Sequence, residues 1–168
     1  MQQSLTLADR FALRLGEILS WLFGIATAVT VFEVVSRYLF SAPTIWAHES
    51  TIALSALGFI FGGGYALARD DHIRITTVYL LAGPRLKLVL DWASIVCGLF
   101  YLSILAWAGT NVADRAWQSF ERSGSAWNPP TPTVLKTALV VGALLMLVQM
   151  IAKAVALATR GPEQAGER

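Results

Sequence analysis

The sequence is poor in the residues that build most catalytic and metal sites, with one cysteine and two histidines among 168 residues. Cys97 has no partner for an intrachain disulfide, and we expect it to pack as a small buried hydrophobe. His48 and His72 are 24 positions apart, about 36 Å along a helix, which is too far to ligate one haem iron. Ile52 stands where the zinc motif H-E-x-x-H needs its second histidine. We therefore expect no metal and no cofactor in this chain.

Charge is also scarce. Only 14% of the residues are Asp, Glu, Lys or Arg, and 55% are hydrophobic, whereas soluble domains average roughly 25% charged residues. A soluble chain of this size could hardly bury so much apolar surface, so lipid is the better solvent. The formal net charge of +2, without a long block of like charge, indicates no nucleic-acid partner. Neither G-x-S-x-G nor G-K-[ST] occurs, and we predict no catalytic residues and no enzyme activity.

Four apolar runs are long enough to cross a bilayer, which takes ~20 largely apolar residues per helix. They lie at about 18–40, 46–68, 88–113 and 134–159. We predict an all-α integral membrane protein whose single domain, 1–168, contains four transmembrane helices. A cleavable signal peptide is the alternative for the first run, since Arg10 and Arg14 precede it. The run continues to Phe40, and this extra length favours a retained helix.

The segments outside these runs differ in character. The segment at about 72–84 mixes apolar with basic side chains, and we predict that it lies as a short amphipathic segment in the headgroup layer. A solvated loop is the alternative. The stretch DRAWQSFERSG, 114–124, is expected to continue the third helix past the bilayer, with a solvated loop again as the alternative. The polar tail, 161–168, is expected to be disordered.

Lysine and arginine are distributed unevenly between the two sides of this topology. Nine lie at the N-terminus, in the second connection and near the C-terminus, and four lie on the opposite side. Because cytoplasmic loops are enriched in Lys and Arg, both termini are predicted to be cytoplasmic. The nine are Arg10, Arg14, Arg69, Arg74, Arg85, Lys87, Lys153, Arg160 and Arg168, and the four are Arg37, Arg115, Arg122 and Lys136.

Two charged residues interrupt the first apolar run. Glu33 and Arg37 are four positions apart, which places them on one face of a helix. An isolated charge in the bilayer costs ~3 kcal/mol or more, so we expect the two to pair at a helix interface. The alternative is that Glu33 carries a proton or an ion.

The second run contains Gly58 and Gly62 in a G-x-x-x-G pattern, a spacing that lets another helix approach closely. A charged cluster follows the run and consists of Arg69, Asp71, His72 and Arg74. It is either a solvated helix end with snorkelling arginines or part of a polar protein network.

Residues 34–75, VVSRYLFSAPTIWAHESTIALSALGFIFGGGYALARDDHIRI, resemble the DctQ family, the small membrane subunits of tripartite ATP-independent periplasmic (TRAP) transporters. The features that carry the resemblance are, in order, Arg37-Tyr38, Pro43, Trp46, Glu49, Gly58 or Gly62, Arg69, and His72-Ile73-Arg74. The length and the four helices match over the whole chain. His48 stands where the family often has a second acidic residue, and Thr76 where it tends to place an aspartate.

The resemblance implies a role in the bacterial inner membrane. The small subunit would act as a scaffold for a large transmembrane transport subunit, and a periplasmic binding protein would deliver an organic acid. An ion gradient, typically sodium acting on the large subunit, would drive transport without ATP. The scaffold or subunit-interface residues would be Glu33, Arg37, Gly58, Gly62, Arg69, Asp71, His72 and Arg74, and the docking residues for the binding protein would be Trp46, His48 and Glu49.

Two other functions are compatible with a small four-helix membrane protein. A self-sufficient exporter would use Glu33 as its proton site. A membrane anchor for a redox complex would bind quinone or share a haem with another subunit, and the scarcity of histidine counts against it.

Overall fold

The computed structural model describes residues 7–68 and 83–159, which form four long helices. They are α1 (Leu7–Tyr38), α2 (Ala47–Ala68), α4 (Pro84–Gln118) and α5 (Thr131–Ala158). Each contains a stretch long and apolar enough to cross a membrane, and these two ranges contain no strand. The predicted all-α architecture with four spanning helices is confirmed. The interfacial segment predicted at about 72–84 lies outside the described residues except for its end, and the tail 161–168 lies outside them entirely.

Two of the helices extend well beyond the apolar runs that predicted them. α1 begins at Leu7 and so includes Arg10 and Arg14. α4 begins with Pro84 in its first turn, where the missing N–H of proline does no harm. It has 35 residues, or about 52 Å of helix, against about 30 Å for the hydrocarbon core of a bilayer. It ends at Gln118, so the third predicted helix does continue past its apolar run.

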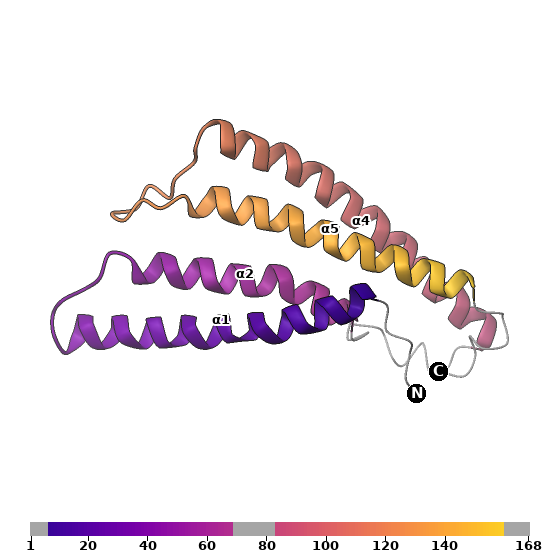
Figure 1. Ribbon diagram of the computed structural model, residues 1–168, viewed down its shortest axis with the longest axis horizontal. Coiled ribbons are helices and arrows are strands. Elements are labelled where there is room, and N and C mark those ends of the chain that lie inside the picture. The colour runs from indigo at the N-terminus through magenta and orange to yellow at the C-terminus, as the bar shows by residue number, and fades with distance from the viewer. Residues whose placement is uncertain (1–6, 69–82, 160–168) are drawn as a thin grey trace.

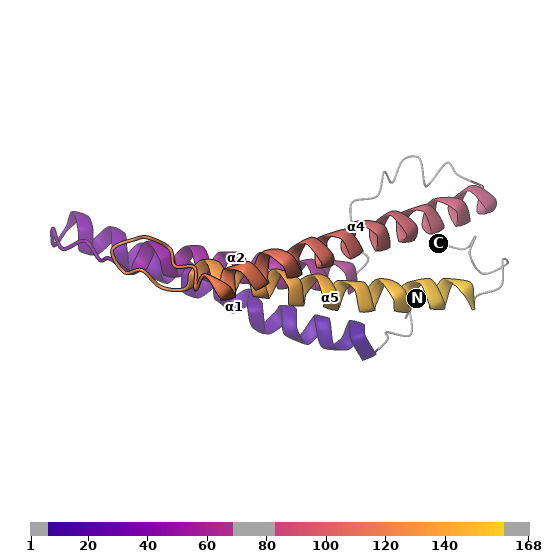
Figure 2. The same ribbon diagram turned by 90° about the horizontal axis from the view of Figure 1, so that it is seen from above.

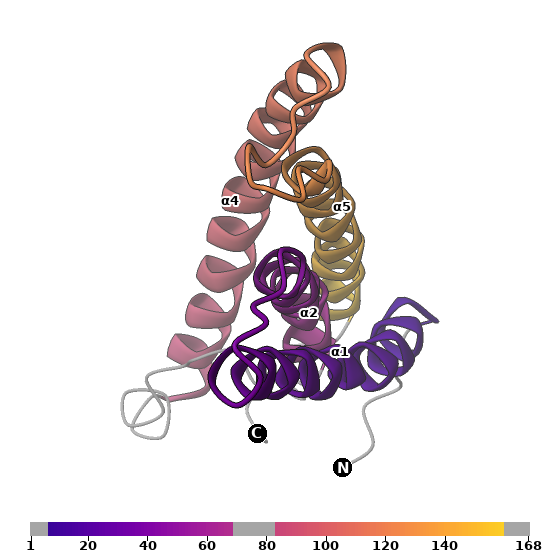
Figure 3. The ribbon, with the colours of Figure 1, turned by 90° about the vertical axis from the view of Figure 1, so that its left-hand side faces the viewer.

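The helices form two antiparallel hairpins, α1 with α2 and α4 with α5, joined mainly where α2 packs on α5 (Figure 1). The order across the molecule is therefore α1, α2, α5, α4. Seen end-on, α4 stands outside α5 and does not close a square bundle (Figure 3). We call the end that bears the α1–α2 turn, 39–46, and the α4–α5 loop, 119–130, the turn end. In the view of Figure 2 the helices spread apart toward the other end.

Small residues line the contacts between helices. The buried positions of α4 recur at separations of three, four and seven, the spacing of a coiled-coil seam. They are Ile95, Leu102, Ala106, Gly109, Ala113 and Ala116. α5 contributes Ala138, Gly142 and Ala143. Because lipid tails are as apolar as leucine, membrane helices associate through close packing, which such small side chains allow.

Large apolar side chains cover the outside of the molecule. Trp21, Phe59 and Trp107 are each more than 70% exposed, at 74%, 73% and 71%. In lipid these faces need no burial, because each helix satisfies its backbone hydrogen bonds internally. Cys97 is also exposed, so the expectation of a buried thiol is wrong. Ile95, two positions earlier, is on the face of α4 that packs on the core, so Cys97 lies on a different face of the helix.

Candidate functional site

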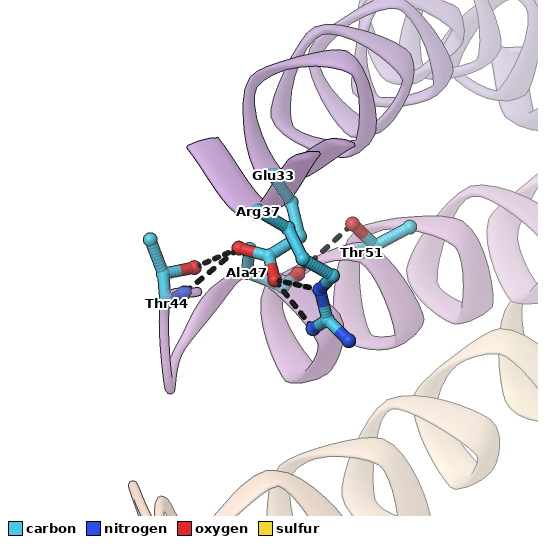
Figure 4. Close-up of polar contacts among 5 residues, drawn as sticks. All are labelled: Glu33, Arg37, Thr44, Ala47 and Thr51. Atoms are coloured by element: carbon cyan, nitrogen blue, oxygen red, sulfur yellow. Dashed lines mark hydrogen bonds and ion pairs between the residues drawn. The ribbon is translucent and has the colours of Figure 1, made fainter. Parts of the chain in front are cut away.

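Charged and hydroxyl side chains gather at the turn end of the first hairpin (Figure 4). On α1, Oε1 of Glu33 accepts hydrogen bonds from Nε of Arg37 at 3.0 Å and from its Nη2 at 2.5 Å. The expected pair between residues four apart therefore forms. The Glu33 side chain is only 12% exposed, whereas that of Arg37 is 52% exposed.

The second oxygen of Glu33 holds the α1–α2 turn. Thr44 donates its backbone N–H to Oε2 at 3.0 Å and its hydroxyl to the same atom. Glu33 thus accepts four hydrogen bonds, which matches the four lone-pair sites of a carboxylate. The turn needs such an anchor because Ser41 adopts a positive φ of 52°, which is uncommon for a residue with a side chain. A carboxylate with every site occupied is suited to fixing a turn and poorly suited to carrying a proton.

A pocket of about 620 Å³ opens between α1 and α2 beside this cluster. It is lined by Thr30, Glu33, Val34, Arg37, Tyr38, Ala47, His48 and Thr51. The hydroxyls of Thr30 and Thr51 lie 3.4 Å apart across the two helices. Each also donates to a carbonyl one turn earlier in its own helix, at 2.9 Å and 3.0 Å. The pocket is therefore polar at its base and open to the surroundings at Arg37.

The three residues predicted to meet a binding protein all lie at the turn end but in different settings. Trp46 is 37% exposed and stacks on Phe32, with ring centroids 6.0 Å apart. His48 is exposed and lines the pocket. Glu49 is half-buried, and its Oε2 is buried without a hydrogen-bond partner in the part of the chain that the structure describes. Trp46 and His48 are thus accessible from outside, and Glu49 is only partly so.

The two glycines of the G-x-x-x-G pattern have different surroundings. A Cβ added to Gly58 would lie 2.6 Å from Cζ of Phe23, so Gly58 packs directly on α1. A Cβ added to Gly62 would meet nothing within 4 Å. Of the two, only Gly58 makes a close helix contact within residues 7–68 and 83–159.

The remaining predicted residues, Arg69, Asp71, His72 and Arg74, fall in 69–82, outside the described residues. A different polar contact joins the hairpins near that point. Lys153 of α5 donates its ammonium group to the carbonyl oxygen of Leu67 in the last turn of α2. The last four carbonyls of a helix lack partners within the helix and carry its partial negative charge, so a lysine there is stabilising.

Gln149, one turn before Lys153, is 2% exposed. Its amide nitrogen and oxygen have no hydrogen-bond partner among the described residues. Sequence reasoning missed both α5 residues as structural contacts. The available signal was a polar pair four positions apart inside an apolar run, which places both side chains on one helix face.

Replacing Glu33 by glutamine should loosen the turn end. The amide loses two of the four acceptor sites and leaves the Arg37 guanidinium without a counter-charge. Because hydrogen bonds to a charged carboxylate are stronger than those to a neutral amide, we expect a loss of stability, measured as a lower melting temperature in mild detergent. Glu17→Gln is the matched control, since Glu17 is an exposed carboxylate on the same helix. Equal melting temperatures for the two variants would contradict the anchoring role.

Comparison with known proteins gives one family and one curated relative. Residues 26–160 match the family model described as "Tripartite ATP-independent periplasmic transporters, DctQ component". The chain is also 26% identical over 105 residues to the C4-dicarboxylate TRAP transporter small permease protein DctQ of Vibrio cholerae serotype O1 (strain ATCC 39315 / El Tor Inaba N16961). That alignment covers 60% of this chain and 45% of the relative, so the chain spans less than half the length of the relative it matches.

Proposed function

Because this chain belongs to the DctQ family of TRAP transporter components, we propose that it is the small membrane subunit that supports a larger transport subunit. The family consists of transport components and not of enzymes. The observation that carries the proposal is the family match across residues 26–160, which includes the Glu33 cluster and the whole second hairpin. Substrate movement is assigned to the larger subunit, driven by an ion gradient, with sodium as the expected coupling ion and an organic acid as the expected substrate.

A static scaffold is consistent with the way charges are arranged at the turn end. Glu33 is paired with Arg37 on the first hairpin. On the second hairpin, Glu121 forms an ion pair with Lys136. Each acid is thus held by a base from its own hairpin, an arrangement that stabilises loops and does not require the charges to change during transport.

We assign the larger subunit to the open face of α2. Gly62 has space beside it. Phe59, three positions earlier, makes an edge-to-face contact with Phe23 of α1 at 5.1 Å between ring centroids and still leaves 73% of its surface exposed. A small residue next to an exposed aromatic ring permits close approach by a helix of another protein. Glu33, Arg37 and Gly58 serve this face indirectly, because they hold α1, α2 and the turn in place.

We assign the turn end to the periplasm and both chain termini to the cytoplasm of an inner-membrane protein, as the Lys/Arg distribution predicts. In this orientation Trp46, His48 and Glu49 are on the side from which a periplasmic binding protein arrives. The α4–α5 loop at the same end is internally hydrogen-bonded, since Oδ1 of Asn128 accepts the N–H of Gly124 at 3.1 Å. Loops built in this way present a defined surface to a partner.

The proposal is tested by isolating the tagged chain from its native membrane in mild detergent and identifying what accompanies it by mass spectrometry. We expect a larger polytopic membrane protein in near-equal amount. Recovery of the chain alone, at detergent concentrations that preserve its melting temperature, would contradict the scaffold role. Transport by the purified chain alone in liposomes would point instead to an exporter.

A further inference from the structure

The pocket between α1 and α2 has hydrogen-bond donors that its own residues do not use. Glu33 accepts hydrogen bonds from Nε and Nη2 of Arg37, and Nη1 of Arg37 has no partner among the described residues. His48 likewise has no hydrogen-bond partner in the described ranges. In Figure 4 the third guanidinium nitrogen lies away from the carboxylate and carries no contact. Arg37 and His48 therefore line one pocket of about 620 Å³, and each has a possible hydrogen-bond donor without a partner among the described residues.

The carboxylate that could accept from these donors is already occupied. All four acceptor sites of Glu33 are filled by Arg37 and Thr44. The hydroxyl protons of Thr30 and Thr51 go to their own helices. Of the two charged side chains, Glu33 therefore has no acceptor left, and Arg37 has a donor left and no acceptor, since guanidinium only donates. A group rich in acceptor oxygens is the complementary ligand, and the planar fork of arginine suits a phosphate.

The position of the pocket along α1 places it at the level of lipid headgroups. The apolar span Leu13–Tyr38 has 26 residues, or about 39 Å of helix, and the hydrocarbon core takes about 30 Å. Arg37, one residue from the end of that span, therefore lies at the boundary with the headgroup layer.

Apolar side chains flank the same point. On the bilayer side of Arg37, Val31 is 56% exposed and Phe32 is 51% exposed. Val34, which also lines the pocket, is 48% exposed. Such a surface is suited to acyl chains and unsuited to water.

From these features we propose that the α1–α2 pocket binds the phosphate of a phospholipid in the leaflet at the turn end. The phosphate oxygens accept from Arg37 Nη1 and from His48, and the acyl chains extend toward the hydrocarbon core along the exposed apolar residues Val31 and Val34 of α1. Glu33 neutralises part of the arginine charge, so a zwitterionic phospholipid suffices and a strongly anionic one is not required. The inference does not depend on the proposed transport function. It removes His48 from the docking face proposed for a binding protein and leaves Trp46 as the accessible residue there.

The test uses the full chain purified in mild detergent, with phosphatidylethanolamine added at graded concentrations and bound lipid counted by native mass spectrometry. We expect one lipid per chain to bind with an affinity about tenfold higher than in the double variant Glu33→Gln/Arg37→Gln, the difference that one charge-assisted phosphate contact provides. Diacylglycerol, which lacks the phosphate, should bind the two proteins equally. The matched control is Glu121→Gln/Lys136→Gln, the same exchange of an acid–base pair at the same end of the other hairpin, and it should keep the wild-type affinity.

A single variant guards against a folding defect in the double variant. His48→Leu leaves the contacts among Glu33, Arg37 and Thr44 in place, and we expect it to weaken phosphatidylethanolamine binding about threefold with an unchanged melting temperature. Equal lipid affinity in all variants would overturn the proposal. Retention of diacylglycerol as tightly as of phosphatidylethanolamine would do the same. Stabilisation by millimolar inorganic phosphate in the absence of lipid would assign the pocket to a free anion and reject the lipid.

Discussion

Gly142→Leu should separate the two hairpins and lower the stability of the protein by about 3 kcal/mol or more. A Cβ on Gly142 would lie 2.7 Å from Cγ2 of Ile60 and 3.4 Å from its carbonyl oxygen. That methyl group is attached directly to the branched Cβ of Ile60, whose χ1 is restricted in a helix, so it has little freedom to move aside. The helices themselves must move apart.

The effect is large because the α2–α5 contact is the main join between the hairpins. Separating the helices there also moves Met146 and Gln149 of α5 away from Gly63 and Gly64 of α2, on which they pack. Membrane helices have no hydrophobic gain to offset the loss of this van der Waals contact.

The measurement is the melting temperature of the detergent-purified chain, followed by tryptophan fluorescence. Gly142→Ala should give an intermediate decrease, because a single methyl group meets the same Ile60 atoms. Gly24→Leu is the control, since a Cβ on Gly24 of α1 meets nothing within 4 Å. A Gly142→Leu protein that melts with the control would show that the hairpins are joined elsewhere.

The number and type of the helices were predictable from the sequence for a physical reason. In a bilayer every backbone polar group must be satisfied within the chain, so an apolar run of spanning length has to be a helix. The helix ends were less predictable. The first eleven residues of α1, from Leu7 to Glu17, include charged side chains that hydropathy counts against a span, although charged residues are good helix formers.

Residues close in sequence were predicted better than residues brought together by the fold. The spacing of Glu33 and Arg37 predicts their pairing because one helical turn decides it. Thr44, which completes the cluster, depends on the path of a turn that passes through Ser41 at positive φ, and nothing in the local pattern indicates that path. The sequence therefore predicts the Glu33–Arg37 pair and does not predict the contact with Thr44.

The glycines of α2 also show that sequence spacing does not predict which helices pack together. The run GFIFGGG contains four glycines, and a small-residue spacing does not say which helix each one faces. In the structure Gly58 faces Phe23 of α1, Gly63 and Gly64 face α5, and Gly62 faces neither. Gly142 of α5, which packs on Ile60 of α2, lies far along the sequence, and no spacing rule connects it to α2.

Gly62→Leu should leave the chain folded and yet remove its partner. Because a Cβ at Gly62 meets nothing within 4 Å, a leucine there can leave the helix without a clash at its first carbon, and we expect a stability change within about 0.5 kcal/mol. If the larger subunit packs on this face of α2, the leucine fills the space its helix requires. We expect the amount of large subunit recovered per tagged chain to fall about tenfold, as a loss of about 1.4 kcal/mol would give.

The comparison with two other glycines makes this result specific. Gly58→Leu should lower both melting temperature and recovery, because its side chain would enter the contact with Phe23. Gly24→Leu, on an exposed part of α1, should lower neither. The three variants carry the same added side chain, so only position distinguishes them. Intact recovery and transport with Gly62→Leu would reject the α2 face as the subunit interface, while loss of recovery with Gly24→Leu as well would place that interface on α1.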